Sequence, residues 1–202
     1  MTLKNSAQRW GPVSQGLHWL VVLLILCQGT LGLTMTEMDN SPQTVRIYAL
    51  HKSIGLTIFS LAVLRLAWRW YAGTPRPVPG MPRWQEHIAR LTHWALYALL
   101  FAIPLSGWVL NSAAGFPLQW FGLFNLPDIV GQDHDLHEIA EELHQFLFWT
   151  LVALALVHAS AAFYHHLFQR DDTLARMLPR GWVPVEEPST ESLRTEDRPD
   201  AT

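Results

Sequence analysis

The sequence contains very little cysteine and little charge. Of its 202 residues, one is cysteine and 15% are charged, whereas 50% are hydrophobic. The single Cys27 excludes an internal disulfide bond and any C-x-x-C pattern. A composition so apolar and so poor in charge is unlike that of an ordinary soluble domain. It indicates that a lipid bilayer surrounds much of the chain.

Basic residues are missing from one long part of the chain, because no Lys or Arg lies between Arg90 and Arg170. Apolar runs of about 20 residues, the length that crosses a bilayer core, occur at about 15–36, 48–70, 89–111 and 143–167. The first run follows basic residues as a signal peptide does, but it is longer and has no A-x-A site, so we expect a retained helix. The sequence therefore predicts an all-α membrane protein, a four-transmembrane-helix bundle.

The remaining Lys and Arg residues are distributed unequally between the two sides of these spans. They gather in the N-terminal arm, in the link between the second and third spans and in the C-terminal end, and only Arg46 and Lys52 fall on the other side. Because basic residues favour the cytoplasmic side, we expect both termini to be cytoplasmic. Residues 1–183 then form the membrane domain, and the polar residues 184–202 are expected to be a disordered cytoplasmic tail.

The connection between the third and fourth spans is expected on the outer side and is rich in Asp and Glu. Its apolar middle, residues 116–130, is interrupted by proline and glycine and is too short to cross a bilayer. We expect this segment to lie along the membrane interface or to cap the bundle.

Histidines within the expected spans are the most informative polar residues, because ionisable groups are costly in a membrane and usually functional. His144 and His158 are 14 residues apart, which is about 21 Å along a helix and returns to nearly the same face. His144 is expected at the depth of His51, and His158 at the depth of His18. The sequence therefore predicts two imidazole pairs at two depths.

Two facing imidazoles at each of two depths suit the two axial positions of a haem iron. A zinc ion would instead need three or four ligands at one depth. Without a C-x-x-C-H motif, each haem would be held noncovalently. Cations are expected near the haem propionates: Lys52 at the outer side, and Arg65 or Arg69 at the inner side.

Other histidines leave alternatives open. His93 has no evident partner, and we consider a hydrogen bond to a quinone or a structural hydrogen bond. His165 remains an alternative inner ligand to His158, because it follows two helical turns later. His137 is excluded as the outer ligand, since about 31 Å would separate it from His158. A surface metal site formed by Asp133, His134 and His137 is a further interpretation.

Several motifs resemble a known family, the bacterial cytochrome b561 family. They are Gly11-Pro12-Val13, His18-Trp19-Leu20, His51-Lys52-Ser53-Ile54-Gly55 and the stretch from His144 to His158. The resemblance extends over about residues 8–180. It implies four helices, two b haems held by His18, His51, His144 and His158, and electron exchange with ubiquinone in the bacterial inner membrane.

Our leading hypothesis is a di-haem b cytochrome that transfers electrons between a periplasmic donor and the ubiquinone pool. Some family members are superoxide oxidases, but the acid-rich outer side disfavours an anionic donor and suits a basic redox protein. Two alternatives are a haem-bearing membrane-anchor subunit of a larger oxidoreductase and a haem-free proton-coupled transporter. Nothing in the sequence indicates a nucleic-acid partner.

Overall fold

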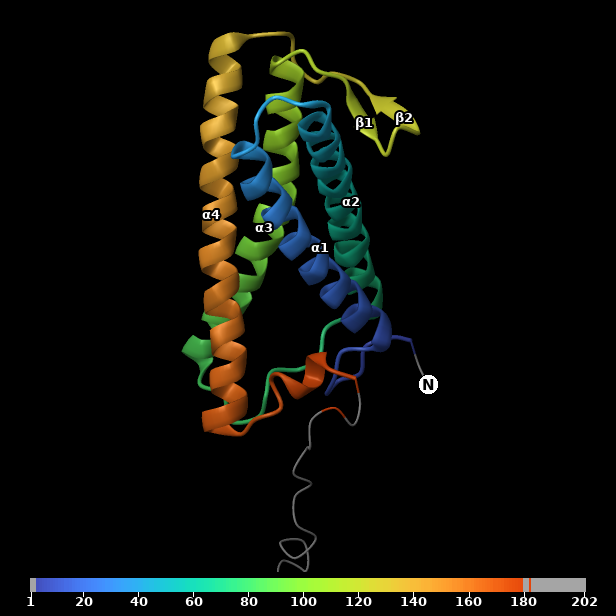
Figure 1. The fold of residues 1–202 in the computed structure, drawn as a ribbon. Coiled ribbons are helices and arrows are strands. Elements are labelled where there is room, and N and C mark those ends of the chain that lie inside the picture. The colour runs from blue at the N-terminus through green and yellow to red at the C-terminus, as the bar shows by residue number, and fades with distance from the viewer. Residues whose placement is uncertain (1–2, 180–181, 183–202) are drawn as a thin grey trace, which may run out of the picture.

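The computed structural model describes residues 3–179 and 182, and four long helices dominate it (Figure 1). Each is long and apolar enough to cross a membrane, which confirms the predicted bundle. The expected tail, residues 184–202, lies outside the described residues. The helices are α1 (Pro12–Thr36), α2 (Pro42–Ala72), α3 (Arg83–Ala113) and α4 (His134–Tyr164), and α4 continues as a π-helical turn, η1 (His165–Gln169).

The fourth helix begins at His134, well before the start expected near residue 143. Asp133 caps it by accepting a hydrogen bond from the backbone N–H of Leu136 at 3.0 Å, and Asp135 lies in the first turn, where a carboxylate favours a helix start. These residues are polar and lie beyond the apolar run. Hydropathy alone therefore placed the boundary too late.

The helices pack around a small apolar core formed by α1, α2 and α3. Val21 and Ala62 are almost fully buried, and Ile54, Ile58 and Leu100 complete the cluster. Many other large apolar side chains are exposed, among them Leu23 and Leu26 of α1. In a bilayer these apolar side chains contact lipid instead of water, so their exposure carries no hydrophobic penalty.

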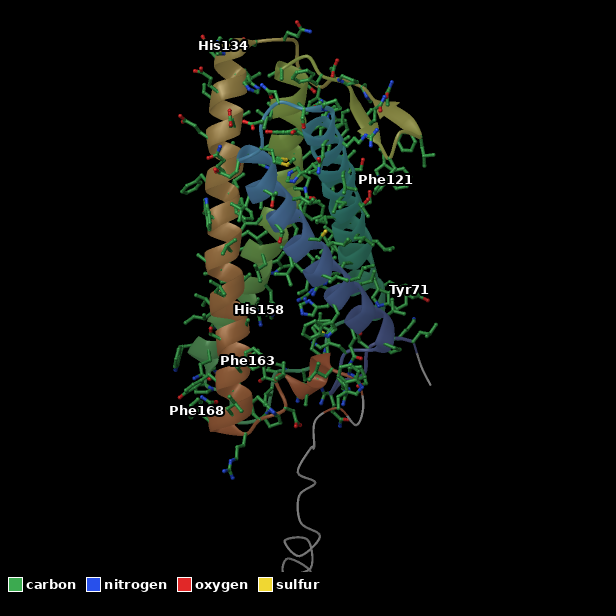
Figure 2. All side chains as sticks on the ribbon, viewed as in Figure 1. Tyr71, Phe121, His134, His158, Phe163 and Phe168 are labelled. Carbon is green, nitrogen blue, oxygen red and sulfur yellow. The ribbon has the colours of Figure 1, made fainter. Side chains whose placement is uncertain are left out.

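The outer connection folds as a short antiparallel hairpin of β1 (Leu118–Trp120) and β2 (Phe124–Leu126). It rests against α2, because Ser53 Oγ accepts from the Phe121 N–H at 2.9 Å and Trp120 Nε1 donates to Thr57 Oγ1 at 3.1 Å. Figure 2 shows Phe121 on this hairpin, beside α2. The segment therefore lies along the side of the bundle at its outer end.

The described ends of the chain meet at the other end of the bundle, which we call the inner end (Figure 1). Residues 170–179, including η2 (Ala175–Met177), form a segment that we call the inner strap. Gln15 Nε2 donates to the carbonyls of Arg176 and Leu178 at 3.2 and 3.1 Å, and Trp19 Nε1 donates to Met177 O at 2.9 Å. The strap thereby joins the end of α4 to the start of α1.

Candidate functional site

Four histidines of the membrane-spanning helices lie in two pairs between helices. The outer pair joins His51 of α2 and His144 of α4, whose ring centres are 6.3 Å apart at an interplanar angle of 68°. The inner pair joins His18 of α1 and His158 of α4, at 6.4 Å and 81°. Figure 2 shows His158 in the inner half of α4. Two pairs of nearly equal separation thus share one helix.

The separation within each pair fits two imidazoles bound on opposite sides of one metal. A metal–imidazole bond is about 2.0–2.1 Å and the ring centre lies about 1.1 Å beyond the nitrogen, so two rings in line have centres about 6.2–6.4 Å apart. Two imidazoles joined directly by a hydrogen bond would have ring centres closer together than this, unless a water or another group bridged them. The Nδ1 atoms of His18 and His51 are buried and have no hydrogen-bond partner among the described residues. The ring separations, rather than these unpartnered atoms, are what suit each pair to a b haem with two histidine ligands.

His93 of α3 also reaches the inner level. Its ring centre lies 5.2 Å from that of His158, at an interplanar angle of 71°. That separation is too short for two rings that share one metal in line, by about 1 Å. The distances therefore favour His18 over His93 as the partner of His158, and they leave His93 beside the pair.

Glycines give the outer imidazoles their room. A Cβ added to Gly107 would lie 3.1 Å from Cε1 of His144, and one added to Gly32 would lie 3.2 Å from Cε1 of His51. Both approaches are tighter than ordinary contacts, so a larger residue would push the ring away. The serine before Gly107 also contacts the pair: Ser106 Oγ lies 2.9 Å from Nδ1 of His144.

Lys52, expected to serve an anionic group at the outer side, is held by the protein itself. Its ammonium donates to Asn111 Oδ1 at 3.0 Å and to the Pro117 carbonyl at 3.2 Å. Asn111 Nδ2 in turn donates to the Phe116 carbonyl at 2.6 Å. Lys52 thus fastens the connection before the hairpin to α2 and α3. Two of its three N–H groups are used by neutral oxygens, and no carboxylate among the described residues neutralises it.

Arg65 and Arg69 line a small cavity at the inner end, together with Trp68 and His93. Arg65 lies over the ring of Tyr97 at 5.5 Å, and Arg69 lies 5.6 and 5.9 Å from the ring centres of Trp10 and Trp94. Among the described residues neither guanidinium pairs with a carboxylate.

The donors of this cavity are not matched by acceptors. Trp68 Nε1 is buried and donates to no atom of the described residues. Unpaired buried donors are costly, and so is a buried cation without an anion. The cavity measures about 50 Å³, whereas pockets for whole small molecules measure about 300–1,000 Å³. It suits a carboxylate or another small acceptor rather than a quinone ring.

His165, the alternative inner ligand, is engaged elsewhere. Its Nδ1 lies 2.6 Å from Oδ2 of Asp171, and the two side chains are 13% and 16% exposed. Burial by itself would raise the pKa of Asp171, but hydrogen bonds from Thr173 and His165 outweigh it and hold that pKa below its usual value. His165 therefore fixes the start of the inner strap, and His158 remains the candidate inner ligand.

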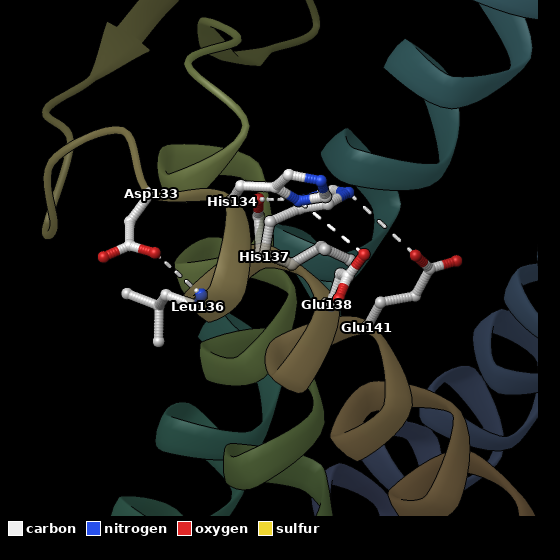
Figure 3. Close-up of polar contacts among 7 residues, drawn as sticks. Asp133, His134, Leu136, His137, Glu138 and Glu141 are labelled. Atoms are coloured by element: carbon white, nitrogen blue, oxygen red, sulfur yellow. Dashed lines mark hydrogen bonds and ion pairs between the residues drawn. The ribbon is translucent and has the colours of Figure 1, made fainter.

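The histidines at the start of α4 do not form a metal site. His134 Nδ1 lies 3.7 Å from Glu138 and His137 Nε2 lies 3.9 Å from Glu141, while Asp133 is used as the helix cap (Figure 3). A hollow of about 430 Å³ lies beside them, lined by small and polar residues. Within residues 3–179 and 182, no group of three or more His, Cys, Asp or Glu is arranged to hold a metal ion. The surface metal interpretation is wrong for the part of the chain described.

Three features of the site escaped the sequence analysis: Ser106 and Gly107 beside His144, Gly32 beside His51, and the unpaired indole of Trp68. The sequence did contain a signal for the first feature: Ser106 and Gly107, a polar residue followed by glycine, come just after Pro104 in an otherwise apolar span. Trp68 carried no such signal, because tryptophan near a span end is ordinary at a membrane interface.

The chain is similar to known proteins over most of its length. A model of the family described as prokaryotic cytochrome b561 matches residues 9–180. The chain is 35% identical over 185 residues to cytochrome b561 homolog 2 of Escherichia coli strain K12, covering 88% of this chain and 95% of that protein. It is 29% identical over 167 residues to cytochrome b561 homolog 1 of the same organism, covering 81% and 93%. It is also 29% identical over 176 residues to a Yersinia pestis protein named "Probable superoxide oxidase CybB", covering 86% and 97%.

Proposed function

Because the chain belongs to the prokaryotic cytochrome b561 family, and is therefore a multi-pass membrane haem protein, we propose that it carries electrons across the bacterial inner membrane through two b haems. The donor binds at the outer end, and the acceptor is the ubiquinone pool. The observation that supports this proposal best is the pair of matched imidazole separations, 6.3 and 6.4 Å, at two depths of α4.

In this proposal His51 and His144 hold the outer haem, and His18 and His158 hold the inner one. The haems supply one-electron chemistry at two depths of the bilayer. The protein supplies the axial nitrogens, excludes water from the iron and fixes the distance between the two levels. Each imidazole pair comes from two different helices, so haem binding also fastens the bundle together.

Charged residues near each level then receive the haem carboxylates. Arg65, Arg69 and the indole N–H of Trp68 form the inner group, supported by the lack of any protein acceptor for the Trp68 donor. At the outer level Lys52 has one N–H left after its bonds to Asn111 and Pro117.

Ubiquinone is the proposed acceptor, and His93 its hydrogen-bond partner at the inner level. His93 stands beside the ring of His158, at a separation too short for the two rings to hold one metal between them in line. Because the inner cavity is smaller than a quinone ring, the quinone would contact His93 outside that cavity.

Superoxide is the donor that we propose to test first, because a relative 29% identical to this chain bears the name of a superoxide oxidase. In that reaction two superoxide anions would each lose one electron to become O2, and one ubiquinone would take up the two electrons and two protons. No protein carboxylate among the described residues neutralises Lys52, and its one remaining N–H can bond either a haem carboxylate or superoxide, but not both. A basic redox protein is the competing donor, since the outer loop is acidic.

The proposal is tested with purified protein in lipid nanodiscs. We expect two noncovalent b haems per chain, a reduced-minus-oxidised spectrum of b type, and haem reduction by superoxide that ubiquinone reverses. Superoxide dismutase added beforehand should abolish that reduction. A colourless protein, or one haem per chain, would refute the di-haem carrier. Haem reduction by a basic cytochrome but not by superoxide would support the proposed electron carrier and show that a basic redox protein, not superoxide, is its donor.

A further inference from the structure

The four proposed haem ligands differ in what their second ring nitrogen contacts. Nδ1 of His18 and Nδ1 of His51 are buried without a partner among the described residues. Nδ1 of His144 instead lies 2.9 Å from Ser106 Oγ on α3. A metal-bound imidazole is commonly oriented and made more basic when its other nitrogen donates a hydrogen bond. The chain therefore supports one ligand of the outer pair in a way that it does not support its partner.

The second contact of Ser106 indicates the direction of this hydrogen bond. Ser106 Oγ lies 2.8 Å from the carbonyl oxygen of Ile103, one turn earlier in α3. A carbonyl can only accept, and a serine hydroxyl has one hydrogen, so that hydrogen goes to Ile103. The lone pairs of Oγ are then free to accept from the N–H of His144. This arrangement favours the tautomer of His144 that carries its proton on Nδ1, and it leaves the lone pair of Nε2 for a metal.

The local sequence of α3 makes this contact specific. Pro104 has no backbone N–H, so the helix is altered at this point, and Gly107 leaves room for the imidazole, since a Cβ there would lie 3.1 Å from Cε1 of His144. Ser106 is 7% exposed, so water does not compete for its hydroxyl. The hydroxyl, the small neighbour and the imidazole form one fitted contact between α3 and α4.

We infer that Ser106 is a positioning residue that fixes the tautomer and orientation of His144 and lowers the midpoint potential of the outer haem. A donated hydrogen bond gives the imidazole partial imidazolate character, which stabilises the oxidised iron relative to the reduced iron. The inference rests on the proposed di-haem function, and it concerns the outer level alone.

The test compares Ser106→Ala with two other variants by redox titration of the haem spectrum. Ser106→Thr keeps the hydroxyl. Ser60→Ala is the matched control, because Ser60 Oγ bonds only to the Leu56 carbonyl of its own helix, at 3.0 Å, and is exposed. The His158→Ala variant, which should retain the outer haem alone, identifies the midpoint potential that belongs to that haem.

We expect Ser106→Ala to raise the outer midpoint potential and to leave the inner one unchanged, whereas Ser106→Thr and Ser60→Ala behave as the wild type. Loss of the outer haem alone from Ser106→Ala, with retention in Ser106→Thr, would also support the inference. An unchanged outer potential, or an equal shift of both potentials, would overturn it. A wild-type protein without two haems would instead refute the proposed function.

Discussion

The outer and inner levels of this bundle have nearly the same imidazole separation but different surroundings. At the outer level His144 contacts Ser106 and Lys52 contacts Asn111, although Nδ1 of His51 has no partner among the described residues. At the inner level Arg65 has no carboxylate partner, and Trp68 has no acceptor among the described residues. Helix placement thus makes the two pairs alike, while the neighbours of each pair make them chemically different. The polar side chains of the inner level therefore depend more on a bound haem to complete their hydrogen bonds.

The largest expected effect comes from removing one ligand of one level. Replacing His144 with Ala should remove the outer haem and halve the haem content, because one axial bond cannot hold a noncovalent haem that needs two. The inner haem should remain, since His158 lies about 21 Å from His144 along α4 and pairs with His18 of α1. Haem per chain by pyridine haemochrome assay, and the number of redox waves, measure the result.

His137→Ala is the matched control for that variant. His137 lies two turns before His144 on the same helix and contacts Glu141 and the carbonyl of Leu110 instead. This control should keep both haems. Loss of both haems from His144→Ala, or of one haem from His137→Ala, would contradict the view that the two levels bind haem independently.

A smaller effect is expected at the unpaired donor of the inner level. Trp68→Phe removes the indole N–H and keeps most of the ring, so it deletes a hydrogen bond to a charged acceptor, about 1.5–3 kcal/mol. The inner haem should bind roughly tenfold more weakly or worse, and the outer haem should be unaffected. Haem release to apomyoglobin measures this. Trp70→Phe is the control, because Trp70 is 73% exposed; equal effects of the two variants would show that Trp68 binds no acceptor.

The smallest effect on haem content is expected at His93. His93→Phe should keep both haems, because the 5.2 Å separation from His158 is too short for an axial pair. The rate of electron exchange with ubiquinone should fall, since the proposed hydrogen bond is lost. His18→Ala is the contrasting variant and should lose the inner haem. If His93→Phe lost that haem while His18→Ala kept it, the inner pair would have to be reassigned.

The sequence predicted the features that follow from periodicity and depth. Apolar length predicted the four helices, and the spacing from His144 to His158 predicted which residues of α4 meet His51 and His18. Hydropathy could not predict the start of α4 at His134, because a capping aspartate rather than apolar residues defines it. Ser106, Gly32 and Trp68 were missed for another reason. Their contacts lie between helices, and neither periodicity nor span length encodes the rotation of one helix against another.

Helix α4 contributes one residue to each imidazole pair, while His18 and His51 come from two different helices. An α-helix resists changes in length, so about 21 Å of hydrogen-bonded backbone separates His144 from His158 whatever the neighbouring helices do. If two haems bind as proposed, movement of α1 or α2 would change the tilt of each macrocycle but not the spacing of the two imidazoles that α4 contributes. In the proposed carrier, the bundle can therefore adjust to the surrounding lipid while His144 and His158 keep their spacing along α4.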